Sequence, residues 1–164
     1  LDYFKSTIAP ETQKKSFLRH LELAEKVGRP VIVHNRDADE DCLECLQQFP
    51  LVRAVFHCFG SDLKFAEKVW KCGYMTSFTG IITFNSASSL REVVAEAPLD
   101  KMMVETDCPY LAPQAYRGKR NEPKYVLEVV KKIAEIRGMD FESVVAVTTA
   151  NAESFFKFPG LECN

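Results

Sequence analysis

The chain has 164 residues, 46% of them hydrophobic, which suits one globular domain with a sizeable core. Its formal net charge of −2 and its pI near 6.0 exclude a broadly basic nucleic-acid-binding surface, so any recognition of phosphate must be local. We find no run of about 18 uncharged apolar residues and no basic-then-apolar leader, so we expect no membrane span, no export signal and a cytoplasmic location.

Helical and extended patterns alternate along the chain. Apolar residues recur at helical spacing over 11–27, whereas short runs rich in β-branched residues, such as 31–34, predict buried strands. Glycine or proline follows each of the first four predicted helices and is a common stop signal there. The predicted helices are 11–27, 39–49, 61–72, 86–96, 123–137 and 141–156, and the predicted strands are 31–34, 53–58, 74–78 and 102–106.

This order predicts an α/β protein with a parallel sheet whose two faces are covered by helices. We find no linker or low-complexity tract, so residues 1–164 are interpreted as a single domain. Right-handed crossovers place the carboxyl ends of all parallel strands on one rim, in a barrel or in an open sheet. His34, His57 and Asp107 each end a predicted strand. One site is therefore expected to collect all three side chains.

These three residues favour a metal site. Two imidazoles and a carboxylate are common ligands of a divalent cation such as zinc or manganese. A single histidine at a strand end is more often a hydrogen-bonded structural residue, but two histidines and an aspartate at equivalent places in successive βα units favour metal binding. His20, the third histidine, lies near the edge of the apolar face of the first helix and is interpreted as structural.

The cysteines indicate free thiols. An even number of cysteines can mean disulfides in a small secreted domain, but this chain is large enough for an apolar core and shows no export signal. Cys42 and Cys45 form a single CxxC motif without a second pair, for which a helix face is a better interpretation than zinc binding. The six cysteines are Cys42, Cys45, Cys58, Cys72, Cys108 and Cys163.

Arg36 is a candidate anion-binding residue because it follows His34 by two positions. On a loop at the carboxyl rim, its guanidinium would clamp a carboxylate or phosphate through two parallel hydrogen bonds. An ion pair with a neighbouring aspartate, at position 37, 39 or 41, is an equally good interpretation.

The loop after the last predicted strand is locally cationic. It contains Arg117, Lys119 and Arg120, followed by Asn121 and Glu122. Three cations above the predicted site would attract an anionic substrate in spite of the nearly neutral net charge. An ordinary solvated loop is the alternative.

Glu105 and Asp107 alternate at the end of the last predicted strand. We expect them to point to opposite sides and therefore not to form an acid–base pair. Asp107, at the very end, is the better metal ligand or proton acceptor. Glu105 is expected to bind an arginine or lysine of a neighbouring element, or to hold the loop.

Taken together, the motifs resemble the TatD family of metal-dependent deoxyribonucleases. The resemblance runs over essentially the whole chain, although the segment at 56–61 lacks the serine that usually precedes its glycine. The matching segments are LDY (1–3), the helix over 13–27, PVIVH with NRDA (30–38), FHCFGS (56–61), SFTG (77–80), VETDCPYL (104–111), NEP (121–123) and TANAESFF (149–156).

The resemblance implies a TIM-type (β/α)8 barrel that hydrolyses DNA, as single strands or at ends, with one to three divalent metal ions (Mg, Mn or Zn). By resemblance, His34 and His57 would hold one metal, and Asp107, the expected catalytic residue, would hold another. The residues implied to contact the substrate phosphate and backbone are Arg36, Arg117, Asn121 and Glu122.

The chain departs from the family pattern in length. A full barrel takes about 250 residues, so we expect only its second half, with four βα units plus the C-terminal helices. The family's His-x-His motif and the glutamate before its LDY segment have no counterpart here. We expect either a fragment of a longer protein or half-barrels that self-associate through open sheet edges.

Two other functions stay open. One is a related amidohydrolase that acts on amides or lactones, and the other is a non-catalytic, truncated barrel that binds a partner. The cationic loop and Arg36 favour a phosphate substrate, and no lysine ends a predicted strand as a carbamylated metal ligand would.

Overall fold

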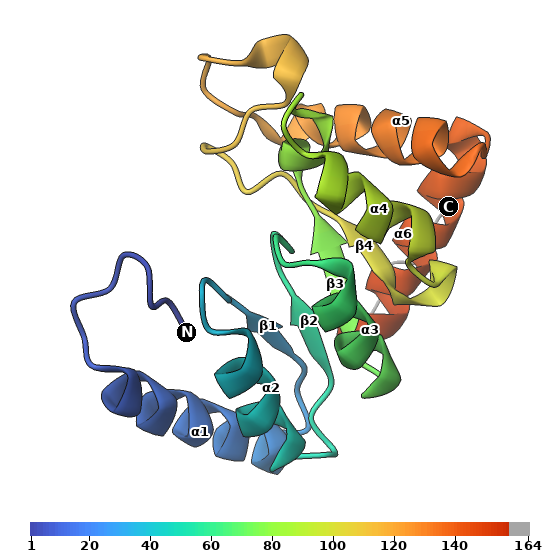
Figure 1. The fold of residues 1–164 in the computed structure, drawn as a ribbon. Coiled ribbons are helices and arrows are strands. Elements are labelled where there is room, and N and C mark those ends of the chain that lie inside the picture. Colours follow the sequence, from blue (N-terminus) through green and yellow to red (C-terminus); the bar gives the residue numbers. More distant parts are fainter. Residues whose placement is uncertain (158–164) are drawn as a thin grey trace.

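The computed structural model describes residues 1–157 (Figure 1). Residues 158–164, with Cys163 and the end of the predicted domain 1–164, lie outside the described part. Four parallel strands form one open sheet in the order β1-β2-β3-β4, so that neighbours in sequence are neighbours in space. The strands are β1 (Val31–Val33), β2 (Ala54–Phe56), β3 (Met75–Phe78) and β4 (Met102–Val104).

Within residues 1–157, six α-helices accompany this sheet. Consecutive helices pack against one another along the chain, and an ion pair between Glu40 and Lys68 joins the second to the third. Across residues 1–157, no helix is long and apolar enough to cross a membrane. The helices are α1 (Pro10–Val27), α2 (Asp39–Gln47), α3 (Leu63–Lys71), α4 (Ser88–Glu96), α5 (Val126–Arg137) and α6 (Phe141–Phe156).

Local sequence signals explain where several helices begin and end. Asp62 caps α3 by accepting a hydrogen bond of 2.8 Å from the Phe65 N–H, and Asp140 caps α6 in the same way. Gly28 ends α1 with a φ of 66°, a left-handed conformation that costs glycine little. These caps satisfy backbone groups that the helix itself leaves without a partner.

The main core lies between the sheet and the helices. Side chains such as Phe56, Phe78 and Met102 pack there with Leu46 and Ile133, and all five are almost fully buried. The packing is close, so the helices hold the strands, and thus the strand ends, in fixed relative positions.

The opposite face of the sheet is only partly covered, which corrects the expectation of helices on both faces. Phe155 of α6 packs there on Val55, Met75 and Met103. Ile32, the partner of Val55 in the β1–β2 register, is 62% exposed. Within the described residues, a continuous apolar run in a strand therefore does not mean that both faces of the sheet are equally buried.

All ten predicted helices and strands are present, but two boundaries differ in an informative way. The helix predicted over 123–137 begins with a 3-10 turn, Pro123–Tyr125, before α5 starts at Val126. The last strand ends at Val104 rather than at position 106. Beyond Val104 the chain leaves the sheet, and the next residues serve the site described below.

Candidate functional site

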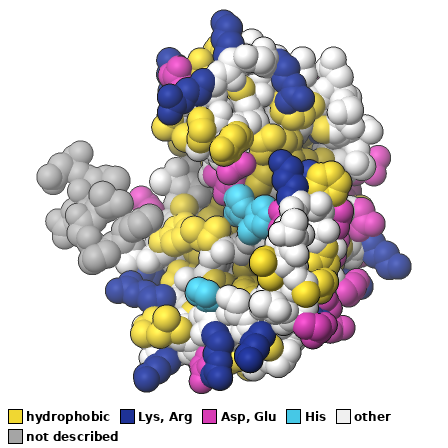
Figure 2. All heavy atoms as spheres, turned by 90° about the vertical axis from the view of Figure 1, so that its left-hand side faces the viewer, with side chains coloured by type: hydrophobic (Ala, Val, Ile, Leu, Met, Phe, Trp, Pro, Cys, Tyr) yellow, Lys and Arg dark blue, Asp and Glu magenta, His cyan; other side chains and the backbone are white. Residues whose placement is uncertain are grey.

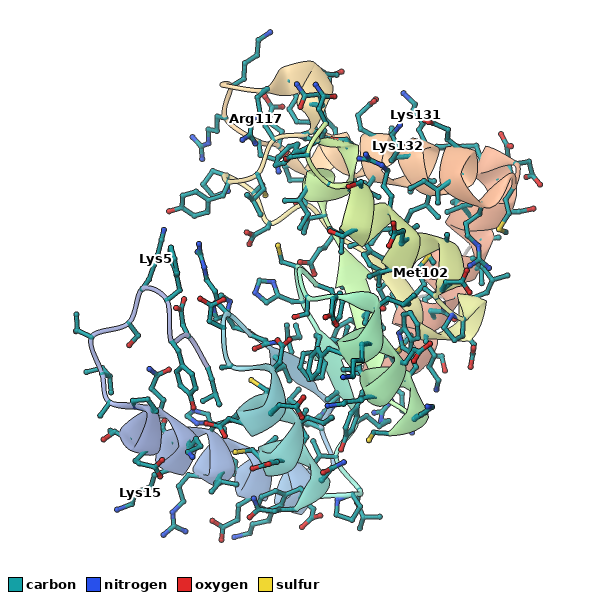
Figure 3. The ribbon with its side chains drawn as sticks, in the orientation of Figure 1. Lys5, Lys15, Met102, Arg117, Lys131 and Lys132 are labelled. Atoms are coloured by element: carbon teal, nitrogen blue, oxygen red, sulfur yellow. The ribbon has the colours of Figure 1, made fainter. Side chains whose placement is uncertain are left out.

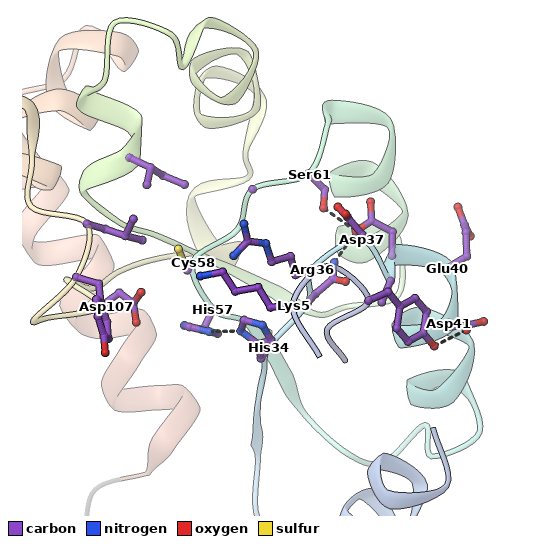
Figure 4. Close-up of a pocket in the computed structure, with 18 residues that line it drawn as sticks. Lys5, His34, Arg36, Asp37, Glu40, Asp41, His57, Cys58, Ser61 and Asp107 are labelled. Atoms are coloured by element: carbon purple, nitrogen blue, oxygen red, sulfur yellow. Dashed lines mark hydrogen bonds between the residues drawn. The ribbon is translucent and has the colours of Figure 1, made fainter. Parts of the chain in front are cut away.

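A cleft of about 1060 Å³ opens at the carboxyl ends of the strands. His34 follows β1, His57 follows β2 and Asp107 lies beyond β4, and all three line this cleft (Figure 4). The convergence that the strand order predicts is therefore confirmed. Histidine side chains also reach the surface beside acidic and basic groups on the face shown in Figure 2.

The two imidazoles face each other directly. His34 Nδ1 lies 3.1 Å from His57 Nε2, and the ring centroids are 5.3 Å apart. Main-chain bonds fix this pair, because the His57 N–H donates to the Val33 carbonyl of the neighbouring strand. Two ring nitrogens from adjacent strands thus point at one shared position.

Each imidazole has a carboxylate on its other nitrogen. Asp2 Oδ2 lies 3.1 Å from His34 Nε2, and Glu105 Oε1 lies 3.1 Å from His57 Nδ1. A hydrogen bond from the Lys5 backbone N–H, aided by the bond from His34, lowers the pKa of Asp2 to about 2. The pKa of His57 lies above its ordinary value, chiefly because the ring hydrogen-bonds to Glu105, while burial opposes the rise.

The expectation that Glu105 binds an arginine or lysine was wrong. Within residues 1–157, Glu105 makes no ion pair with arginine or lysine. It accepts instead from His57, from the Cys58 N–H at 2.9 Å and from Ser77 Oγ at 2.8 Å. The alternation argument fails because residues two apart on a strand share a face, and because the strand ends before either carboxylate.

The backbone is in an uncommon conformation at three residues that line the cleft. Asp37, Cys58 and Asp107 have φ values of 53°, 45° and 55°. Residues other than glycine seldom adopt this left-handed backbone conformation, and those that do cluster at functional sites. The three lie just after β1, β2 and β4 in turn, where they turn the chain from the sheet into the rim of the cleft.

Two cations reach into the cleft, and one of them was missed by the sequence reasoning. The Arg36 guanidinium lies 4.2 Å from the centre of the Phe4 ring and forms no ion pair within the described residues, so the ion-pair alternative is not realised. Lys5 also lines the cleft and is among the lining residues drawn in Figure 4. One feature of the sequence could have indicated Lys5. Asp2 is a residue type that favours turns, and its carboxylate accepts a hydrogen bond from the Lys5 backbone N–H.

The cationic part of the loop after β4 does not line the cleft as expected, although Tyr110 and Leu111, earlier in the same loop, do. Arg117 lies at the outer part of this loop (Figure 3), with its guanidinium 3.9 Å from the centre of the Phe84 ring. Glu122 is paired with Lys124 at 2.8 Å. Neither Arg117 nor Glu122 lines the cleft that holds the histidines.

Asn121, which was expected to contact the substrate, is buried and bonds to the backbone of the loop after β4. The side chain is 2% exposed, and its amide donates to the Thr106 carbonyl at 2.7 Å and to the Tyr110 carbonyl at 2.6 Å. Both bonds hold the turn that carries Asp107. A buried amide that is satisfied in this way cannot also contact a phosphate.

The cysteine and His20 interpretations agree with the structure. Cys42 and Cys45 are buried on α2, and burial raises the pKa of the Cys42 thiol to about 11. Their CxxC motif is therefore a helix face. The five cysteines among residues 1–157 are free thiols. His20 is exposed, and its Nδ1 lies 2.8 Å from the Ser16 carbonyl of its own helix.

The histidine pair fits a metal ion in part. Two nitrogens that bind one tetrahedral zinc ion at about 2.1 Å lie about 3.4 Å apart, close to the 3.1 Å between His34 Nδ1 and His57 Nε2. Across residues 1–157, no group of three or more His, Cys, Asp or Glu side chains is arranged to hold a metal ion. The described residues thus supply two fitting donors and not a whole coordination shell.

Fold and site together define a class of protein. It is a parallel α/β protein with a histidine–carboxylate cleft at the carboxyl rim of its sheet. A family model, described as TatD related DNase, matches residues 1–157. The chain belongs to this family.

Relatives and solved structures agree with this assignment. The "uncharacterized metal-dependent hydrolase YabD" of Bacillus subtilis is 41% identical over 159 residues, which is 96% of this chain and 62% of that protein. YcfH of Escherichia coli K12, which has the same description, is 39% identical over 95% of this chain and 60% of its own length. The crystal structure of YJJV, a TatD homolog from E. coli K12, superposes with a TM-score of 0.87 at 29% identity and covers 97% of this chain and 62% of that one. The chain therefore spans about three fifths of each.

Proposed function

We propose that this chain is the part of a metal-dependent hydrolase that carries half of its metal site, and that the enzyme cleaves phosphodiester bonds of DNA. The observation that carries the proposal is the pair of facing nitrogens on His34 and His57, 3.1 Å apart in a cleft that Asp107 also lines. Membership of the TatD related DNase family supports it, as do relatives described as metal-dependent hydrolases. The four βα units would belong to a TIM-type barrel.

His34 and His57 would hold a divalent cation, and imidazole ligands suit zinc better than magnesium. When bound, such an ion lowers the pKa of water and polarises a phosphoryl oxygen. Asp107 would accept the proton of the attacking water, because its carboxylate lies on the same cleft. Glu105 keeps the His57 ring in place through its 3.1 Å contact.

Arg36 and Lys5 would bind the phosphate of the substrate. Both line the cleft with the histidines. Because the chain as a whole carries a net charge of −2, attraction of an anion to the rim would depend on local cations such as these two. The Arg36 guanidinium offers a planar set of donors that matches phosphate, whereas the Lys5 ammonium is a point charge. A DNA strand, single-stranded or at an end, would then lie with one phosphate between these cations and the imidazoles.

Where these four βα units are not closed into a TIM-type barrel, we also propose that the chain self-associates through the free edge of β1. The Val31 N–H and the Val33 carbonyl bond toward β2, so the alternate backbone groups, those of Ile32, face the free edge. At the other edge, Asn151 of α6 donates to the Met102 carbonyl at 2.8 Å and partly occupies β4. The edge of β1 is therefore the better one for pairing with a second copy.

Cleavage of a labelled single-stranded oligonucleotide by the intact protein tests the enzymatic proposal. We expect cleavage that requires Zn²⁺ or Mn²⁺ and that falls about a hundredfold or more in His57→Ala, since one of two metal donors is lost. His20→Ala is the matched control, because His20 is exposed on α1 and bonds only to its own helix. Equal cleavage by His57→Ala, or turnover of amides or lactones in place of DNA, would contradict the proposal.

A further inference from the structure

We propose that Asp2 and Glu105 are positioning residues that fix the tautomers of the two histidines, so that His34 Nδ1 and His57 Nε2 both present lone pairs to one cation. The inference rests on the proposed metal site and adds two residues to it. It assigns a role to an aspartate and a glutamate that lie far from the histidines in the chain.

The contacts define which nitrogen of each ring carries the proton. A carboxylate can only accept a hydrogen bond, and a neutral imidazole has a single N–H. His34 Nε2 faces Asp2 Oδ2 at 3.1 Å, so that nitrogen carries the proton and Nδ1 is bare. His57 Nδ1 faces Glu105 Oε1 at 3.1 Å, so Nε2 is bare.

The two bare nitrogens then point at each other. His34 Nδ1 and His57 Nε2 are 3.1 Å apart, a distance at which two bare lone pairs repel unless a proton or a metal cation lies between them. The carboxylates thus prepare the pair to receive a positive charge at this position, and a metal ion that binds there takes the place of the shared proton. The hydrogen bonds that ligating imidazoles donate to carboxylates also make the imidazoles more basic, which strengthens their bonds to a metal.

Both carboxylates are held in place before any ligand arrives. Asp2 Oδ1 accepts from the Phe4 and Lys5 backbone N–H groups at 3.0 and 2.7 Å, which leaves Oδ2 for His34. The Asp2 and Glu105 side chains are 23% and 27% exposed, so they are mostly shielded from water.

Glu105 is held from three directions. It reaches across β3, where Ser77 Oγ donates to its second oxygen at 2.8 Å, to the Cys58 N–H and the ring of His57. An arrangement with this many fixed contacts holds a ring at one angle, which is what a preorganised metal ligand needs.

Zinc titration by calorimetry of the intact protein, first stripped of metal, tests the inference. We expect Asp2→Asn and Glu105→Gln each to weaken Zn²⁺ binding about tenfold or more, because both keep the shape and lose the charge. Asp37→Asn is the matched control. It removes the same charge from a residue that lines the cleft beside the histidines, and within the described residues Asp37 makes no hydrogen bond to either imidazole, so the zinc affinity of this variant should stay within about twofold of wild type.

Nitrogen NMR of the zinc-loaded wild-type protein gives a second readout, the protonated nitrogen of each imidazole, which a change in stability alone does not alter. We expect protons on His34 Nε2 and His57 Nδ1, and faster exchange of the latter with water in Glu105→Gln. Coordination of wild-type His57 through Nδ1 would overturn the inference even if a variant failed to fold. Zinc affinities of Asp2→Asn and Glu105→Gln equal to that of Asp37→Asn would also overturn it.

His57→Ala separates this inference from the function on which it rests. If His57→Ala loses zinc while both carboxylate variants bind it normally, the proposed metal site is supported and the proposed positioning role is contradicted. If the wild-type protein binds zinc no better than His57→Ala, the proposed metal site itself falls, and the positioning role falls with it.

Discussion

Tyr3 is the residue that ties the segment before α1 to α2. Its hydroxyl donates a hydrogen bond of 2.6 Å to Asp41 Oδ2, and Lys14 of α1 lies 3.4 Å from the same oxygen. The bond from Tyr3 is the main reason that the pKa of Asp41 lies below its ordinary value. The same contact matters for the site, because Asp2, one residue before Tyr3, must stay beside His34.

Tyr3→Phe is expected to destabilise the fold by about 1 kcal/mol at neutral pH, since it removes one partner of a hydrogen bond to a charged group. Because the folded-state pKa of Asp41 is lowered, its contribution is present above the unfolded-state pKa and is lost as the pH falls through the folded-state value. Urea unfolding of both proteins should therefore show a difference at pH 7 that shrinks in strong acid. A difference that grows on acidification would contradict this explanation.

Also at the scale of residues, the sequence indicated the candidate metal ligands better than it indicated the carboxylates that hydrogen-bond to the two histidines. His34, His57 and Asp107 could be found because parallel strands end on one rim. Glu105 could not be assigned to His57, because that contact spans β3 and depends on which strands are neighbours and where each one ends. Asp2 required knowledge that the segment before α1 runs beside the residues after β1, as the Asp2–Arg36 bridge shows.

At the scale of elements, the turn after β3 and the loop after β4 fit together through a glycine. A Cβ atom on Gly80 would lie 2.6 Å from the Leu111 carbonyl oxygen and 3.0 Å from the Pro113 backbone nitrogen. Both neighbours are backbone atoms, so they cannot move aside as a flexible side chain would. The segment that carries Leu111 begins at the turn of Asp107, so this close approach helps to set one wall of the cleft.

Gly80→Ala is therefore expected to cost about 1–3 kcal/mol of unfolding free energy, because overpacking forces the backbone apart. Gly60→Ala is the control, since its added Cβ would meet only the Cys58 carbonyl oxygen at an ordinary 3.7 Å. Thermal or urea unfolding of the two variants measures the difference. Equal stability would mean that the loop after β4 yields easily.

Element types followed from the sequence because periodicity and end signals agreed, as with the Asp62 cap of α3. Strand ends were harder to predict. The last strand stops at Val104, and the turn beyond it is held by Asn121, whose amide donates to the Thr106 and Tyr110 carbonyls, tertiary contacts that no local pattern contains. The cationic loop at 117–122 was misplaced for a similar reason, since Arg117 found an aromatic partner, Phe84, outside the cleft.

At the scale of the whole molecule, the sheet is open and its two edges differ. β4 is partly occupied by Asn151, whereas the Val31–Val33 strand has a hydrogen-bonded partner on one side only within residues 1–157. Ile32, in the middle of that strand, is 62% exposed. Exposed, apolar edge strands tend to pair with other chains, and two copies joined by the same edge would form a two-fold symmetric dimer.

Ile32→Lys should abolish this association, because a charged side chain on an edge strand opposes pairing and would have to be desolvated. Sedimentation equilibrium at micromolar concentrations measures the effect as a shift from dimer to monomer. Leu51→Lys is the matched control, since Leu51 is also an exposed apolar residue, at 82%, but lies in the turn before β2 and not on the edge. A wild-type protein that stays monomeric, or a Leu51→Lys variant that dissociates as fully as Ile32→Lys, would show that the edge of β1 does not join two copies.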